Sequence, residues 1–460
     1  MSSQITKESM NSAEKRALVG LASLYAFRMV GLFMVLPVMM TYGMALNGAT
    51  AAMLGLALGA YGITQSLFQI PLGWLSDRVG RKPVIAGGLL MFAFGSLIAA
   101  TADNVTVLIL GRILQGSGAI ASSTMALLTD LTREQFRTQA LAAVGITIGL
   151  SFTLSMMIGP WIALVWGFSG IFWLSAILSI FGLGVLYWFV PNPERDSTHL
   201  ANGHFFRDAA RVLRNRDLLR LDFGIFVLHM GLMATFIVVP ITLLADGLSE
   251  QYHGWLYVPV MIVAFLLMVP FMIVAEKKKL IVQVFSGAVA LMLLVQGLFY
   301  VAPAGWVITG VLLTLYFMAF NYLEAAMPSL LSRLVPLEVK GTAMGVFNTA
   351  QFMGAALGGV IGGMLYQSFG TQGVYLATGL ILGFWLWLSL GQKMPGSILN
   401  ARVYAPGNEA DPVGWATRIS ESLLQLDGVE RVEIENEHRA ARVSYRSGVL
   451  DEYAVKRAAK

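Results

Sequence analysis

Long apolar stretches separated by short polar ones dominate the chain from Leu18 to Lys393. A helix that crosses a bilayer needs about 20 mainly apolar residues, and stretches of about that length follow one another along this region. We therefore predict twelve transmembrane helices. They cover Leu18–Tyr42, Ala51–Leu75, Pro83–Thr101, Val105–Thr129, Thr138–Val165, Gly170–Val190, Leu221–Leu244, Gly254–Ala275, Leu280–Ala302, Trp306–Leu330, Thr342–Gln367 and Gly373–Gly391.

One polar interval, residues 191–220, is much longer than the others and rich in arginine. It divides the membrane region into an N-terminal six-helix bundle, residues 1–190, and a C-terminal six-helix bundle, residues 221–393. The second part of the interval, residues 204–219, has the mixed apolar and basic pattern of an amphipathic helix on a membrane surface. The interval is therefore predicted to be a linker that carries such a helix.

After Lys393 the pattern changes to that of a soluble domain. Residues 400–460 predict the order strand, helix, strand, strand, helix, which indicates a small α+β ferredoxin-like domain. The stretch Leu-Asp-Gly-Val-Glu-Arg-Val-Glu-Ile resembles the heavy-metal-associated type of this fold. That type holds its metal with two cysteines, which would fall near Pro406–Val413, and this segment has none. We expect no metal site there.

Composition supports a membrane protein: 57% of the residues are hydrophobic and 12% are charged, against about 25% charged in globular chains. The chain has no cysteine, which excludes disulfides, thiolate metal sites and thiol nucleophiles. The polar N-terminus, Met1–Ala17, lacks the apolar core of a signal peptide, so the first predicted helix is expected to direct insertion. The fold class is an all-α membrane protein with an added α+β tail.

Charge sets the expected orientation. If Met1 is cytoplasmic, every lysine and arginine lies on the cytoplasmic side except Arg28 and Arg112, which lie within predicted helices. The loops on the opposite side contain no lysine or arginine. This strong positive-inside bias predicts that both termini are cytoplasmic. The net charge of +5 is explained by topology, and we expect no nucleic-acid partner.

The turn between the second and third predicted helices carries the spacing G-x-x-x-D-R-x-G-R-K over residues 73–82. This spacing resembles the helix 2–helix 3 loop signature of the major facilitator superfamily. The resemblance implies two six-helix bundles that rock around a central site, in a bacterial inner (plasma) membrane. It also implies a conformational latch made of Gly73, Asp77, Arg78, Gly80, Arg81 and Lys82, which Asp130 is placed to join.

Two further motifs resemble drug:proton antiporters of the superfamily. The segment Leu-Gly-Arg-Ile-Leu-Gln-Gly-Ser-Gly at residues 110–118 is similar to the helix-4 motif associated there with proton coupling, and Arg112 and Gln115 share a helix face. Residues 145–160 are similar to the glycine- and proline-containing helix-5 motif, although Ser155 and Ala163 replace expected glycines. The added tail domain narrows the resemblance to YajR-type bacterial transporters.

Ionisable and polar groups inside a membrane are costly and are therefore candidates for function. Glu324 is the one acid well inside a predicted helix, and we expect it to carry a coupling proton together with Arg112 and His229. Arg28, Gln115, Asn321 and His229 are expected to line the substrate cavity. The structural alternatives are a neutral acid fixed by a hydrogen bond, an arginine bonded to carbonyls and a histidine used for packing.

Arg28 departs from the resemblance, because multidrug antiporters of this kind often have an acid in helix 1. Anionic or neutral substrates therefore stay open. We predict a proton-coupled secondary transporter, an efflux antiporter for small molecules that is monomeric, with no enzymatic activity, cofactor or metal. The alternatives are a proton-linked importer of sugars or metabolites and a non-transporting membrane sensor whose tail binds a ligand.

Overall fold

Helices make up nearly all of the membrane region in the computed structural model of the chain. The structure describes residues 10–192, 210, 212–278, 280–301, 305–335, 340–390, 398–404, 411–426, 428–435, 440–446, 450 and 452–458. The helices of the first half are α1 (Ser12–Phe33), α2 (Met39–Tyr42), η1 (Gly43–Ala45), α3 (Ala51–Val79), α4 (Arg81–Ala100), α5 (Val105–Ser117), α6 (Ala121–Asp130), α7 (Glu134–Gly184) and η2 (Val185–Phe189). Those of the second half are α9 (Arg216–Ala245), α10 (Glu250–Lys277), α11 (Ile281–Val301), α12 (Trp306–Leu334) and α13 (Lys340–Leu390).

The predicted number of membrane passes agrees with these elements. Within the described residues, 10 helices are long and apolar enough to span a bilayer. Two of them, α7 and α13, have 51 residues each, which at about 1.5 Å per residue is more than twice the hydrocarbon thickness of about 30 Å. Each reverses direction at a glycine with positive φ, Gly167 (φ 71°) or Gly370 (φ 65°). Each therefore supplies two passes, and the predicted total of twelve is confirmed.

The fourth predicted helix, Val105–Thr129, is interrupted. α5 ends at Ser117 and α6 begins at Ala121, with Gly118 outside helical geometry (ψ 47°). The backbone of α4 passes very close to this point, since a Cβ added at Gly118 would lie 2.3 Å from the Gly88 carbonyl oxygen. The break lets two backbones touch where a side chain would not fit.

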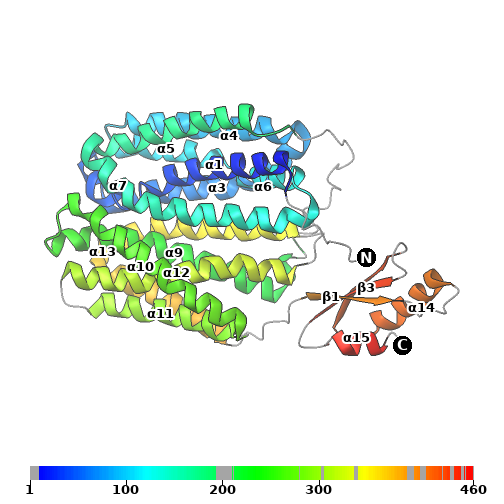
Figure 1. Ribbon diagram of the computed structural model, residues 1–460. Coiled ribbons are helices and arrows are strands. Elements are labelled where there is room, and N and C mark those ends of the chain that lie inside the picture. Colours follow the sequence, from blue (N-terminus) through cyan, green and yellow to red (C-terminus); the bar gives the residue numbers. More distant parts are fainter. Residues whose placement is uncertain are drawn as a thin grey trace. The chain divides into compact units, whose positions relative to one another are not determined.

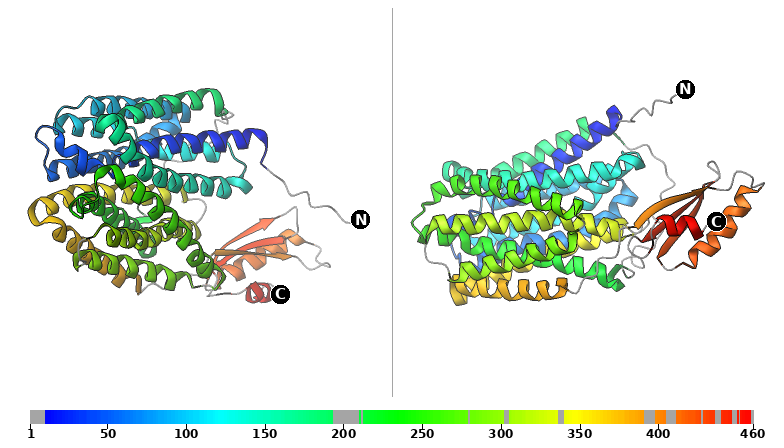
Figure 2. Two further views of the ribbon diagram at one scale, coloured as in Figure 1. Left: turned by 60° about the vertical axis from the view of Figure 1, so that its left-hand side comes forward. Right: turned by 60° about the horizontal axis from the view of Figure 1, so that its bottom comes forward.

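The helices form two groups, α1–α7 with η2 and α9–α13, which lie side by side in every view (Figures 1 and 2). α3 and α13 meet through glycines. A Cβ at Gly59 would lie 2.5 Å from the Ala356 carbonyl oxygen, and one at Gly55 would lie 2.8 Å from the Cα of Gly363. Small residues allow such close approach of two membrane helices. Gln367 adds a polar contact by accepting from the Ala52 N–H at 3.0 Å.

We name the two ends of the bundles after residues that lie there. The Asp77 end carries the C-terminus of α3 and the first turn of α1, and the Gly48 end carries the loop between η1 and α3. The glycine contacts between α3 and α13 lie in the half of the bundles toward the Gly48 end. Gly254 of α10 approaches α7 in the same half, where an added Cβ would lie 3.1 Å from the Met157 carbonyl oxygen.

The linker prediction is largely untested, because residues 193–209 and 211 lie outside the described residues. This gap contains seven of the sixteen residues of the amphipathic helix expected at residues 204–219. The described part shows that α9 begins at Arg216, five residues before the predicted start, where the Asn215 side chain accepts from the N–H of Asp217 at 3.0 Å. That residue is a typical N-cap. The domain boundaries remain predictions.

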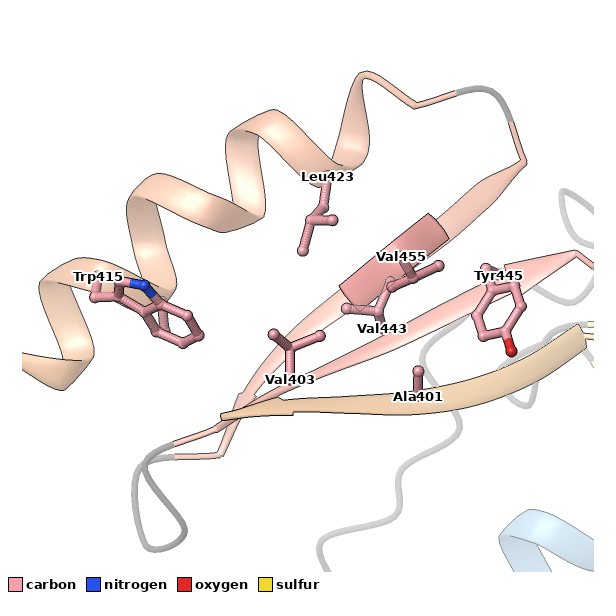
Figure 3. Packing of buried hydrophobic residues seen from close by; sticks show 8 residues of the cluster. Ala401, Val403, Trp415, Leu423, Val443, Tyr445 and Val455 are labelled. Carbon is pink, nitrogen blue, oxygen red and sulfur yellow. The ribbon is translucent and has the colours of Figure 1, made fainter. Parts of the chain in front are cut away.

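The tail forms a three-stranded antiparallel sheet with two helices. Its elements are β1 (Ile398–Tyr404), α14 (Pro412–Leu424), β2 (Val429–Glu435), β3 (Ala440–Arg446) and α15 (Glu452–Ala458), and the strand order is β1-β3-β2. Alternate strand residues point to one face and pack against Trp415, Leu423 and Val455 of the helices (Figure 3). The predicted order of elements is confirmed, and the tail has an apolar core of its own.

Candidate functional site

A carboxylate, an imidazole and an amide from three helices meet in the C-terminal bundle. They belong to Glu324 of α12, His229 of α9 and Gln351 of α13. The Gln351 amide nitrogen donates to Glu324 Oε1 at 3.2 Å and lies 2.8 Å from His229 Nε2. Glu324 Oε2 lies 3.7 Å from the same imidazole nitrogen. We call these three residues the acid cluster.

The hydrogen bonds of the acid cluster define how its imidazole is protonated. His229 Nδ1 lies 3.2 Å from the Ile225 carbonyl oxygen. Because a carbonyl only accepts, Nδ1 carries the hydrogen, and Nε2 of the neutral ring accepts from Gln351. Nε2 is therefore the atom that can gain a proton and then donate it toward Glu324.

Aromatic rings border the acid cluster and connect the two bundles. The Phe320 ring lies 5.8 Å from the His229 ring and 6.0 Å from the Phe152 ring of α7, and Phe152 lies 5.0 Å from Phe33 of α1. Phe317 also contacts Phe152, with ring centroids 5.7 Å apart. We call these four phenylalanines the aromatic bridge. Asn321, predicted to line the cavity, is half-buried, and none of the contacts described for this part of the chain joins it to the acid cluster.

Arg28 lies inside the N-terminal bundle and is only 4% exposed. Its Nη2 donates to the Gln65 Oε1 atom and, at 3.3 Å, to the Tyr61 hydroxyl. Gln65 in turn donates to Gln69 Oε1 at 3.1 Å. We call Arg28, Gln65 and Gln69 the Arg28 cluster. It joins α1 to α3 through polar groups that carry no negative charge.

Arg112 forms the second buried polar centre of this bundle and is 1% exposed. It donates to the Gln115 Oε1 atom at 2.8 Å and to the Ala57 carbonyl at 3.3 Å, and its guanidinium lies 4.7 Å from the centre of the Tyr61 ring. Gln115 continues the chain of bonds to the Ser96 hydroxyl at 2.7 Å. Arg112 and Gln115, which were predicted to share a helix face, are joined by this hydrogen bond. The backbone contact foreseen in the structural alternative is also present.

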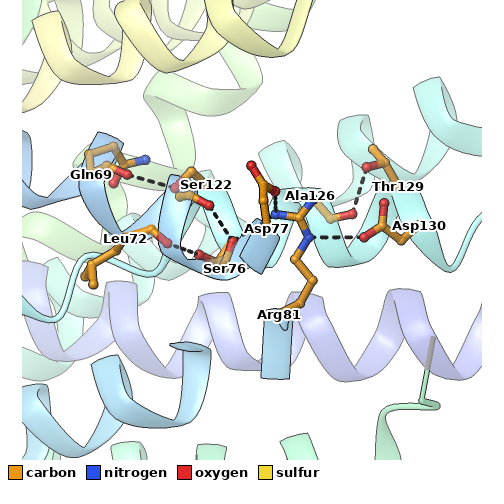
Figure 4. A network of polar contacts seen from close by, with 11 residues as sticks. Gln69, Leu72, Ser76, Asp77, Arg81, Ser122, Ala126, Thr129 and Asp130 are labelled. Carbon is orange, nitrogen blue, oxygen red and sulfur yellow. Dashed lines mark hydrogen bonds and ion pairs between the residues drawn. The ribbon is translucent and has the colours of Figure 1, made fainter. Parts of the chain in front are cut away.

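At the Asp77 end, one arginine lies between two carboxylates (Figure 4). Arg81 donates to Asp77 Oδ1 and, through Nε, to Asp130 Oδ2 at 3.2 Å. Ser76 accepts a further bond from Arg81 at 2.8 Å. We call Asp77, Arg81 and Asp130 the Asp77 cluster. It confirms that Asp130 completes this charge cluster, and it ties together α3, α4 and α6 of one bundle.

The other residues of the predicted latch have separate contacts. The Arg78 guanidinium lies 4.0 Å from the centre of the Trp74 ring, and Lys82 donates to the Val190 carbonyl at 2.7 Å. Gly80 has φ 107°, which the turn between α3 and α4 requires and which other residues rarely adopt. A Cβ at Gly73 would lie 2.9 Å from the Ser122 hydroxyl oxygen, so this glycine keeps α3 close to α6.

Several polar residues of these centres were not predicted. Gln65, Gln69 and Gln351 are amides within apolar stretches, and that rarity was the available signal. Asp222 was placed at the edge of a helix, but the earlier start of α9 buries it to 6% exposure, with both carboxylate oxygens unpaired. Sequence reasoning also missed the ion pair between Glu14 and Arg133, where Glu14 Oε1 accepts from the guanidinium at 2.9 Å.

The structure has two bundles of membrane helices with buried ionisable groups inside them. This architecture is typical of secondary membrane transporters. The Major Facilitator Superfamily model matches residues 18–359 and 323–403, and the chain belongs to this superfamily. Its class is therefore a membrane transporter and not an enzyme class. The expected family and fold are confirmed.

Individual relatives agree with this assignment. The chain is 43% identical over 452 residues to the inner membrane transport protein YajR of Escherichia coli (strain K12), with 98% of each chain covered. It is 27% identical over 346 residues to the multidrug resistance protein MdtH of Yersinia enterocolitica, covering 74% of this chain and 84% of the relative. A solved bacterial homologue of the human lysosomal transporter Spinster matches with a TM-score of 0.68 at 13% identity, over 83% and 98% of the chains, which shows the fold alone. The protein is a multi-pass inner-membrane transporter.

Proposed function

We propose that this transporter is a proton-coupled antiporter that exports small molecules by alternating access. The observation that carries the proposal is the acid cluster, where a carboxylate and an imidazole share one amide inside the membrane. Such a group can be loaded with a proton from one side and unloaded to the other. The name of the MdtH relative, a multidrug resistance protein, supports export over uptake.

The arrangement of the bundles suggests which state the structure represents. Close contacts of α3 with α13 and of α10 with α7 lie toward the Gly48 end. With cytoplasmic termini, as the distribution of basic residues favours, this end faces away from the cytoplasm. We assign the structure to a state closed on that side. In the opposite state the Asp77 end would close, and we assign the Asp77 cluster to latching it.

Protonation supplies the coupling in this scheme. A charge that crosses the whole membrane field changes in energy by about 2.3 kcal/mol per 100 mV, and two transporter states commonly differ by a few kcal/mol. One proton on the acid cluster that crosses part of the field is thus enough to change which state is favoured. Loss of the negative charge of Glu324 would also remove its attraction to a protonated His229.

Glu324→Gln tests the proposal, since it mimics the protonated carboxyl while keeping a partner for Gln351. In proteoliposomes we expect this variant to lose transport driven by a pH gradient and to retain exchange of labelled substrate across the membrane without a gradient. Glu324→Asp should keep part of the coupling. Asp217→Asn is the matched control, because it removes an acid of the same bundle that pairs at the surface with Arg220. Normal accumulation against a gradient by Glu324→Gln would show that the proton is carried elsewhere.

A further inference from the structure

The N-terminal bundle buries the guanidinium groups of Arg28 and Arg112, and Glu14, a buried acid of the same bundle, pairs with Arg133 instead. The acids between residues 18 and 190 are Asp77, Asp103, Asp130 and Glu134, all near helix ends. Within the described residues, neither Arg28 nor Arg112 has a carboxylate partner. An isolated buried charge is expensive, so this imbalance calls for a reason.

The two arginines differ in how well their donors are satisfied. Arg112 bonds a side-chain oxygen and a backbone carbonyl and lies over an aromatic ring. Arg28 bonds Gln65 and Tyr61 and lies near the Phe92 ring, but unlike Arg112 it has a nitrogen, Nε, that is buried without any acceptor. The Nε2 amide of Gln69 in the same cluster is also buried and unpaired. Two unused donors beside one positive charge make the Arg28 cluster short of an acceptor.

The Arg28 cluster lies beside the surface where the bundles meet. Gly62 of α3 approaches α13, since an added Cβ would lie 2.8 Å from the Phe352 carbonyl oxygen. Gln65 and Gln69 follow Gly62 by three and seven residues, which places them on the same side of α3, closer to the Asp77 end. Phe92 of α4 also borders the Arg28 cluster, since its ring centre lies 5.8 Å from the Arg28 guanidinium.

We propose that the Arg28 cluster is the head-group site for an organic anion, a small aromatic or aliphatic molecule with one carboxylate. This inference rests on the proposed transport function and names its substrate class. The guanidinium of Arg28 and the amide of Gln69 would donate to the carboxylate oxygens, because a guanidinium fork matches this planar group. The apolar part would lie against the Phe92 ring, which borders the Arg28 guanidinium.

Equilibrium binding to the purified full-length protein tests the substrate class without any gradient. The probes are benzoate, 2-naphthoate and pyrene-1-carboxylate, each compared by calorimetry with its neutral amide and with the corresponding arylmethylammonium ion. We expect at least one carboxylate to bind tenfold or more tightly than both of its matched analogues. Arg28→Gln should abolish this difference, and Arg28→Lys should keep part of it, because lysine retains the charge but not the fork. Arg16→Gln, which removes an exposed cation of the same helix, should change nothing.

The anion site would be overturned if none of the carboxylates binds, if the amides or ammonium ions bind equally well, or if the preference survives in Arg28→Gln. The folded state of that variant is checked by its melting temperature against Arg28→Lys. A different result would refute the proposed antiport alone. In that case the protein would still prefer the carboxylates in the binding experiment, but a pH gradient would not drive transport of labelled 2-naphthoate. Conversely, proton-driven transport of neutral molecules with no anion preference would refute the head-group site alone.

Discussion

The Glu14 carboxylate holds together two segments that are 119 residues apart. It accepts from the Arg133 backbone N–H at 3.0 Å and from the Arg133 guanidinium at 2.9 and 3.1 Å. It also completes a capping box by accepting from the Asn11 N–H at 2.7 Å. A carboxylate with this many donors is a strong contact, although the guanidinium is partly exposed and screened. It fixes the start of α1 to the start of α7.

At the residue scale we therefore predict that Glu14→Ala destabilises the N-terminal bundle by about 1–3 kcal/mol, because it leaves the Asn11 and Arg133 donors without this acceptor. Glu14→Gln should cost less, since glutamine also completes a capping box. Melting temperature in detergent measures both effects, and binding of the probe carboxylates should not change. An unchanged melting temperature in Glu14→Ala would contradict a stabilising role.

Some contacts of the candidate site join residues of one helix, and others join residues that are far apart in the sequence. Arg112 and Gln115 are three residues apart on one helix, so their bond follows from helical spacing. The acid cluster joins residues 229, 324 and 351, and no spacing along the chain brings these together. Its role in proton coupling stays a prediction until Glu324→Gln is measured.

At the scale of elements, the glycine contact between α3 and α13 decides how closely the bundles approach. Gly59→Val would place side-chain atoms where the Ala356 carbonyl now lies, and overpacking of this kind costs about 1–3 kcal/mol. Because each 1.4 kcal/mol is a factor of ten, the Gly48 end should open about fivefold to hundredfold more often.

Cysteine labelling can measure that opening, because the chain has no cysteine of its own. Met40→Cys is a suitable reporter, since Met40 of α2 is 2% exposed in this state. Its labelling rate should rise about tenfold in Gly59→Val. Gly87→Val is the control, because a Cβ at Gly87 meets no atom within 4 Å. Equal labelling in both variants would argue against α3–α13 packing as the closure of this end.

In this state the Asp77 cluster joins helices of one bundle. We propose that it latches the Asp77 end in the opposite state, in which that end is closed. Asp77→Asn removes one of the two carboxylates beside Arg81. We expect transport to fall several-fold and Met40→Cys labelling to decrease, since loss of the latch favours the state closed at the Gly48 end. Insertion should be normal, because the basic residues that set topology remain.

The result is compared with Asp103→Asn, which removes an acid near the other end of the bundle. Unchanged transport together with unchanged labelling in Asp77→Asn would remove the Asp77 cluster from the mechanism. A drop in membrane insertion would instead show that the cluster serves topology or folding.

At the scale of the whole molecule, the tail has a hydrophobic core of its own. Its buried side chains, among them Trp415, Leu423 and Val455, come from its own strands and helices. We predict that a chain ending at Lys393 inserts, folds and transports, with an altered rate or ligand response. Loss of the folded membrane region on truncation would show that the tail is structural. Leu423→Asp in the full chain is the matched variant, because it disrupts the tail core without shortening the protein.

The number of membrane passes and the order of the tail elements could be predicted from the sequence alone. These properties depend on the length of apolar stretches and on local turn chemistry, such as the glycines at which α7 and α13 reverse. The sequence also singled out Glu324, Arg28 and His229, because ionisable groups are rare in a membrane. The predicted place of Asp130 in the charge cluster followed from its position at the cytoplasmic end of the fourth predicted helix.

Which helix faces meet could not be predicted from the sequence and is seen in the packed helices. In a bilayer, lipid is as apolar as a neighbouring helix, so apolar periodicity does not distinguish a packed face from a lipid-facing one. The partnership of Gln351 with Glu324, the Gln65 and Gln69 amides beside Arg28, and the burial of Asp222 all depend on that choice. Contacts between side chains of distant helices depend on how glycines and aromatic rings pack in three dimensions. They therefore cannot be predicted from the pattern of residues along the chain.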